Sequence, residues 1–163
     1  MHAKDAICNA YDLSRMVLTS YVNDLTDEEL LKRPAEGCNS IAWQLGHLIV
    51  AEGGLLSGVA PGYSIDLPEG FAEKHSTENK SSDDPNDFLG KDEYLAYFEK
   101  LKVATAAALD AQSDDDLDKD PPEHLKQICP NVGGVFMLIA THPMMHVGQF
   151  VPVRRMLNKP IVI

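Results

Sequence analysis

The chain has 163 residues, of which 44% are hydrophobic, so it is long enough for one domain with a buried core. Its 25 acidic residues outnumber 14 basic ones and give a net charge of -11. Such a composition lacks the basic surface that binding to phosphates requires, and we expect no nucleic-acid partner.

An amphipathic helix and a short capped turn are the first expected elements. Residues 5–23 place apolar side chains near a helical stripe, namely Ile7, Leu13, Met16, Val17 and Tyr21. Thr26 and Glu29 have the spacing of a capping box, which predicts a short helical turn that ends by Pro34 and Gly37.

A second long helix is predicted to begin at Asn39 or Ser40, since either side chain can cap it. Residues 41–51 are almost wholly apolar, and Gln44 and His47 form a polar pair among them. Taken alone, a histidine in such a position is more often a hydrogen-bonded core residue than a ligand.

Residues 53–90 are rich in Gly, Pro, Ser and Asp, which predicts a long connection that crosses the fold or covers a site. Asp92 and Glu93 favour the start of a third helix, whose buried side would consist of Tyr94, Leu95, Phe98, Leu101 and Leu109. The acidic run at 114–120 predicts a solvated turn, in which SDDDLDKDP echoes the earlier TDEELLKRP. This repeat predicts an all-α fold, a four-helix bundle with a long crossover connection between two helical hairpins.

The last helix is predicted from residues 127–153, which contain no Asp, Glu, Lys or Arg and therefore indicate deep packing. His142 and His146 are four residues apart, so their Cβ atoms lie about 6 Å apart on one face of that helix. Polar residues in the middle of the stretch, these histidines among them, argue against a transmembrane span, and we expect no membrane partner.

Two interpretations of this histidine pair are open. The rings can be core residues, each hydrogen-bonded to a backbone carbonyl, or they can be two ligands of a divalent metal. If the helix of His47 packs beside the last helix, three imidazoles converge, which is the ligand set of an open zinc-type site, and on that ground we favour the metal. Three neutral ligands suit zinc, nickel, copper or cobalt, and leave the ion its full charge to lower the pKa of a bound water or deprotonate a thiol.

Two further polar residues are candidates for this site. Gln149 continues the stripe of the two histidines, so we predict that it reaches the metal's water or orients an imidazole, with a hydrogen bond to a neighbouring helix as an equal alternative. Glu52 is a remote candidate base, but it lies five residues beyond His47 and off the ligand face, and we interpret it as a surface carboxylate. Metalloproteases of the HExxH type carry their general base where this chain has Pro143, which argues against peptide hydrolysis by that mechanism.

Three stretches carry a family resemblance: LTDEELLKRP, then NSIAWQLGHL, then THPMMHVGQFVPVRRMLNKP. Together they resemble the DinB-like superfamily of small helical metalloproteins, which includes thiol-dependent transferases and isomerases. The resemblance runs from about Leu13 to Pro160. It implies a bundle of four helices that holds a divalent metal, often zinc or nickel, through His47, His142 and His146. It does not imply DNA polymerase activity.

Two functional hypotheses follow for residues 1–163, which we interpret as a single DinB-like domain. In the first, the protein is a metal-dependent enzyme that activates a low-molecular-weight thiol or water against a small-molecule substrate, as thiol transferases do. In the second, it is a non-catalytic, metal-stabilised stress or interaction module. A homodimer through exposed helix faces is a further expectation.

Cellular location is predicted from the cysteines and from the start of the chain. Cys8, Cys38 and Cys129 are far apart and lack CxxC spacing, which indicates free thiols in a reducing compartment, although Cys38 is also an alternative reactive thiol or ligand. No signal peptide or stop-transfer pattern opens the chain, so we expect a cytoplasmic protein.

Overall fold

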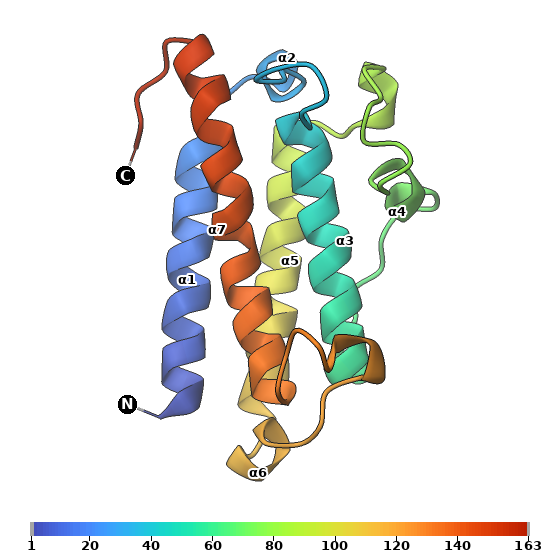
Figure 1. The fold of residues 1–163 in the computed structure, drawn as a ribbon, viewed down its shortest axis with the longest axis vertical. Coiled ribbons are helices and arrows are strands. Elements are labelled where there is room, and N and C mark those ends of the chain that lie inside the picture. The colour runs from blue at the N-terminus through green and yellow to red at the C-terminus, as the bar shows by residue number, and fades with distance from the viewer. Residues whose placement is uncertain (1, 163) are drawn as a thin grey trace.

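Four long helices form the body of the protein in a computed structural model that describes residues 2–162 (Figure 1). They are α1 (Ala3–Val22), α3 (Ile41–Val59), α5 (Lys91–Asp110) and α7 (Val132–Met156). Three short helices lie in the connections, namely α2 (Asp27–Leu30), α4 (Phe71–Lys74) and α6 (Asp114–Leu117), together with 3-10 turns at Pro61–Tyr63, Pro85–Asp87 and Glu123–Leu125. No strand occurs within residues 2–162. The predicted all-α four-helix bundle is confirmed; the predicted domain of residues 1–163 also includes residues 1 and 163, which lie outside the described part.

The long crossover determines which helices of the bundle run parallel and which run antiparallel. α1 and α7 run one way along the bundle and α3 and α5 run the other way, because the segment between α3 and α5 returns along its length (Figure 1). Within each predicted hairpin, α1 with α3 and α5 with α7, the two helices are antiparallel, whereas α3 and α5 are parallel because the crossover joins them. The extensive contacts, however, join α1 to α7, α7 to α3, α3 to α5 and α5 to α1. α7 therefore lies between α1 and α3, and this places its histidines beside α3.

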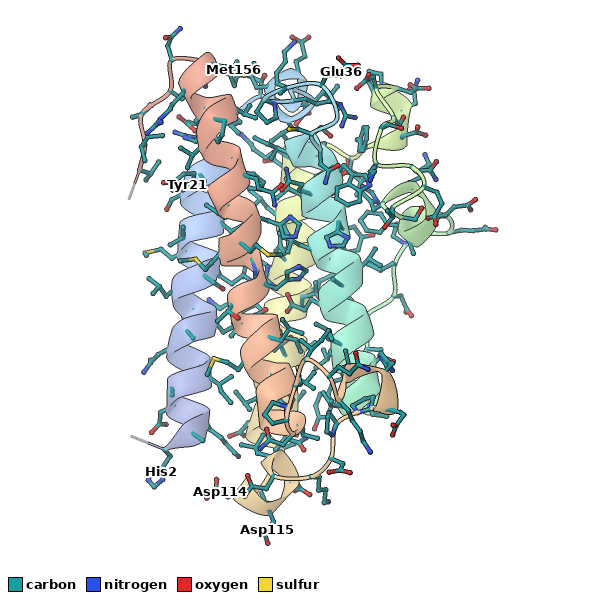
Figure 2. The ribbon with its side chains drawn as sticks, viewed as in Figure 1. His2, Tyr21, Glu36, Asp114, Asp115 and Met156 are labelled. Carbon is teal, nitrogen blue, oxygen red and sulfur yellow. The ribbon has the colours of Figure 1, made fainter. Side chains whose placement is uncertain are left out.

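Side-chain caps define where the connecting helices begin. The Oγ1 atom of Thr26 accepts from the backbone N–H of Glu29, and the Glu29 carboxylate accepts from the N–H of Thr26. Ser113 and Asp116 form the same reciprocal pair at the start of α6, so the echo between the two halves of the sequence corresponds to a repeated capping box. Asp114 and Asp115 point away from the bundle at that end, as expected for a solvated turn (Figure 2).

Two sequence-based expectations about the helices are wrong in detail. α3 does not stop at residue 52 but continues to Val59, because the burial of Leu56 outweighs the low helix propensity of the glycines at its C-terminal end. Leu13 and Met16 were expected on the buried stripe of α1, but about half of each side chain is exposed. α1 packs against α7 and α5, and its buried residues do not include these two.

The crossover is attached to the first two turns of α3. The indole N–H of Trp43 donates to the carbonyl of Ser76 at 3.1 Å. The buried ring of His75 lies against Gly46, so closely that a Cβ atom at residue 46 would come within 1.9 Å of the ring. The Nε2 atom of His75 lies 2.8 Å from the hydroxyl of Tyr94 on α5. One imidazole thus joins the crossover to two helices of the bundle.

Candidate metal centre

Three imidazoles converge at mid-height between α3 and α7. His47 comes from α3 and His142 and His146 come from α7, and one nitrogen of each ring lies within 4.8 Å of the others. The Nε2 atoms of His142 and His146 are 3.2 Å apart. His146 is buried, whereas the other two rings are half-buried. The helix of His47 therefore packs beside the last helix, as the metal interpretation required, and the three predicted ligand residues meet.

Gln44 holds the buried member of the cluster. Its Oε1 atom lies 3.0 Å from Nδ1 of His146, and its amide nitrogen donates to the carbonyl of Asn39 at 3.3 Å. Because a carbonyl oxygen only accepts, the proton of His146 is on Nδ1 and its Nε2 lone pair points into the cluster. A carbonyl acceptor behind the ring is the usual partner of a metal-binding histidine. The sequence had marked Gln44 as one of two polar residues on α3 without assigning it this role.

Trp43 covers the outer face of the cluster. Its indole ring stacks on the imidazole of His47, with centroids 4.9 Å apart and planes inclined by 11°. The hydrogen bond to Ser76 fixes the indole in turn. His47 therefore has a fixed orientation before any ligand arrives, which lowers the entropic cost of binding.

All three rings are favoured in the neutral state that metal coordination needs. Burial lowers the pKa of His47, and burial together with the nearby His47 lowers the pKa of His142. Burial, with smaller contributions from His142 and His47, lowers the pKa of His146 to about 4. At pH 7 each ring therefore offers a nitrogen lone pair and not a second N–H donor.

The donor set fits a divalent transition metal. Ligand nitrogens about 2.0–2.1 Å from a tetrahedral ion lie about 3.4 Å from one another. The 3.2 Å separation of the two α7 nitrogens matches that value, and the 4.8 Å outer limit of the triad requires a shift of about 1.4 Å. Three ligands of this kind leave a coordination position open.

Gln149 and Glu52 are placed differently from the three histidines. Gln149 is exposed on α7, two turns beyond His142, and the orienting contact to His146 comes from Gln44 instead. A role of Gln149 in the pocket stays a prediction. Glu52 is not a surface carboxylate: it is only 4% exposed.

Glu52 is buried because it is the centre of a polar network between α1, α3 and α5. It accepts from Tyr11 Oη at 2.6 Å and from Thr105 Oγ1 at 2.9 Å, and it pairs with the guanidinium of Arg15. Tyr11 and Arg15 are four residues apart on α1, a spacing that could have indicated a polar pair on one face of this helix. The two hydrogen bonds and the ion pair engage this carboxylate, so it is not available as a base at the histidine cluster.

A groove of about 510 Å³ opens beside the cluster, and His142 forms part of its wall. The three cysteines are unpaired, and Cys38 lies exposed ahead of α3 without joining the histidines. In the part of the chain that the structure describes, no helix combines the length and the apolarity needed to cross a lipid bilayer.

Comparison with known proteins places these features in context. The sequence pattern of the DinB superfamily matches residues 10–150. A conserved protein from Enterococcus faecalis has a similar structure, with a TM-score of 0.69 and 17% identity over 98% of this chain and 99% of that one. YfiT from Bacillus subtilis, described as a probable metal-dependent hydrolase with an unusual four-helix bundle topology, is similar with a TM-score of 0.64 and 17% identity, over 96% of this chain and 89% of that one. No curated protein matches.

Proposed function

Since this chain belongs to the DinB superfamily, we propose that it is a metal-dependent enzyme whose divalent ion, zinc or nickel, is held by His47, His142 and His146. The enzyme activates a low-molecular-weight thiol or a water molecule for attack on a small electrophilic substrate, in the manner of a thiol transferase or a hydrolase. The observation that carries the proposal is the convergence of three neutral imidazole nitrogens within 4.8 Å, beside an open groove.

The protein's own groups prepare this site in three ways. Gln44 fixes the tautomer of His146, and Trp43 fixes the plane of His47. Neither a carboxylate nor a lysine belongs to the triad, so the ligands are neutral. A divalent ion bound there keeps its dipositive charge, which lowers the pKa of a water or thiol placed against it. Gln149 is proposed as a pocket residue that meets the substrate or the nucleophile.

No carboxylate base belongs to the described cluster, and this limits which nucleophile the site can activate. Pro143 stands where an HExxH protease has its glutamate, and Glu52 is bound by Arg15. A thiol that loses its proton on binding needs no separate base, whereas attack by water needs more help with proton transfer. We therefore place the thiol-dependent reaction ahead of hydrolysis.

A second candidate function is a metal-stabilised interaction module without turnover. It is favoured by the contacts that the rings make among themselves: an N–H···N hydrogen bond between His142 and His146, and the bond from His146 to Gln44, satisfy polar groups without any substrate. In this case the ion would contribute only folding free energy.

Metal content and thiol consumption distinguish the two candidates. The protein should be purified without a metal-affinity tag, alongside a double variant, His142→Ala with His146→Ala, and a control variant, His2→Ala, whose exposed ring lies outside the cluster. We expect about one transition-metal ion per chain in the wild type and the control, and none in the double variant. Metal-dependent loss of a thiol in the presence of a model electrophile then supports the enzyme.

Either of two results would contradict the catalytic proposal. A well-folded protein that holds no metal would make the histidines core residues. Bound metal with no thiol consumption and no ester hydrolysis, but with stability lost on chelation, would favour the interaction module. The predicted homodimer and the cytoplasmic location are separate proposals, and sedimentation at several protein concentrations tests the dimer.

A further inference from the structure

The groove beside His142 has walls from two helices and one connection. α3 contributes Val50, Ala51, Gly54 and Leu55, α7 contributes Leu138, His142 and Met145, and the segment before α7 contributes His124 and Ile128. Its volume of about 510 Å³ lies in the range of sites that bind small organic molecules. Its wall includes a histidine of the triad, so a molecule in the groove lies next to one ring of the cluster.

The lining is apolar and carries no formal charge apart from the titratable imidazoles. None of its nine residues is Asp, Glu, Lys or Arg, although the whole chain has a net charge of -11. A carboxylate or phosphate in the groove would find no lysine or arginine among these nine residues, and away from the metal it would be repelled by the acidic surface. An uncharged ligand meets neither cost.

Apolar side chains at the rim of the groove are unusually exposed. Ile128 is 67% exposed and Met145 is 61% exposed. Covering them removes apolar surface from water, and the thioether of a methionine adapts to ligands of different shape. The rim thus favours an occupant with an apolar body, whose polar reacting group would face the hydrogen-bonding ring of His142.

Gly54 has no side chain and so leaves space on the α3 side of the groove. A glycine inside a helix costs about 1 kcal/mol relative to alanine, so its presence in α3 needs a reason. Close packing is not the reason, because a Cβ atom built at residue 54 would meet nothing within 4 Å. What a side chain there would fill is the groove. Gly53 is equally unhindered but does not line it, and it therefore serves as a matched control.

From these observations we infer that the groove between α3 and α7 binds the uncharged, apolar body of the electrophilic substrate and that Gly54 is the residue that keeps it open. This assignment rests on the proposed function for the identity of the reaction. The binding itself does not depend on turnover and can be measured without it.

The test uses two dyes that differ by one charged group. N-phenylnaphthylamine is uncharged, and anilinonaphthalene sulfonate carries a negative charge on a similar aromatic body. Dye fluorescence is titrated with wild-type protein, Gly54→Leu and Gly53→Leu, each in its zinc-loaded and chelator-treated form. We expect the uncharged dye to bind wild type and Gly53→Leu alike, and to bind Gly54→Leu about tenfold or more weakly. The anionic dye should bind wild type more weakly than the uncharged dye.

Each outcome bears on one conclusion. Equal binding of the uncharged dye by Gly54→Leu and wild type would overturn the assignment of the groove, and stronger binding of the anionic dye would overturn the substrate class. If Gly54→Leu fails to fold, Ile128→Lys replaces it, since this exposed side chain can change without loss of the core. That variant should bind the anionic dye more tightly than wild type does, and unchanged binding would overturn the assignment. A wild-type protein that takes up no zinc but still binds the uncharged dye would contradict the proposed function alone.

Discussion

Replacing Gln44 by leucine tests whether the buried histidine is prepared as a ligand. Gln44 is only 1% exposed, and its Oε1 atom lies 3.0 Å from Nδ1 of His146. Leucine has a similar size but no acceptor, so the Nδ1–H group of His146 becomes a buried donor without a partner. Such a group costs about 1–3 kcal/mol of unfolding free energy. Loss of the carbonyl behind a metal-binding ring lowers metal affinity about 10–100-fold, which corresponds to about 1.4–2.7 kcal/mol.

Competition between the protein and a chromophoric zinc chelator measures this affinity, and urea denaturation of the metal-free protein measures stability. The matched control is Gln44→Glu, which keeps an oxygen acceptor at the same position and should retain most of the affinity. A Gln44→Leu protein that is folded and binds zinc as tightly as the wild type would refute the role assigned to Gln44. Equal losses in Gln44→Leu and Gln44→Glu would show that the amide matters for its bond to Asn39 instead.

Three further predictions concern stability. Gly46→Ala places a Cβ atom 1.9 Å from the ring of His75, so we expect a loss of about 1–3 kcal/mol in urea denaturation, whereas Gly53→Ala, with no neighbour within 4 Å, should cost nothing. Glu52→Gln leaves the guanidinium of Arg15 buried without its counter-charge, and about 3–5 kcal/mol should be lost; a stability within 1 kcal/mol of wild type would disprove the pairing. Burial lowers the pKa of His75 below its ordinary value near 6.5. Just below pH 6.5 this histidine therefore binds a proton in the unfolded chain but stays neutral in the folded protein. The stability of the metal-free protein should consequently fall as the pH decreases from about 6.5. The slope is at most about 1.4 kcal/mol per pH unit for this one group, and a His75→Phe variant that keeps the full slope would contradict the assignment.

Local features of the sequence were sufficient for the presence and order of the four long helices and for the histidine pair, but not for the end of α3 or for the whole buried face of α1. Capping boxes, apolar runs and the four-residue spacing of His142 and His146 act within one or two helical turns, so each is readable without knowledge of the rest of the chain. The composition of residues 53–90 also predicted the long connection, and the repeated pattern supported the division into two halves. His47 was joined to the pair on the condition that its helix lies beside the last one, which the fold fulfils.

What the tertiary structure alone decided are the contacts between residues far apart in the chain. Gln44 meets His146 across 102 positions, and Glu52 meets Arg15 across 37. Helical periodicity turned Glu52 away from His47 correctly, yet that direction leads into the interior of the bundle, where side chains of α1 and α5 meet it, and so the expected surface carboxylate is a core residue. The physical reason is that a side chain's direction follows from local backbone geometry, whereas its surroundings depend on which helices pack together, and that choice is made by the burial of the whole apolar surface at once.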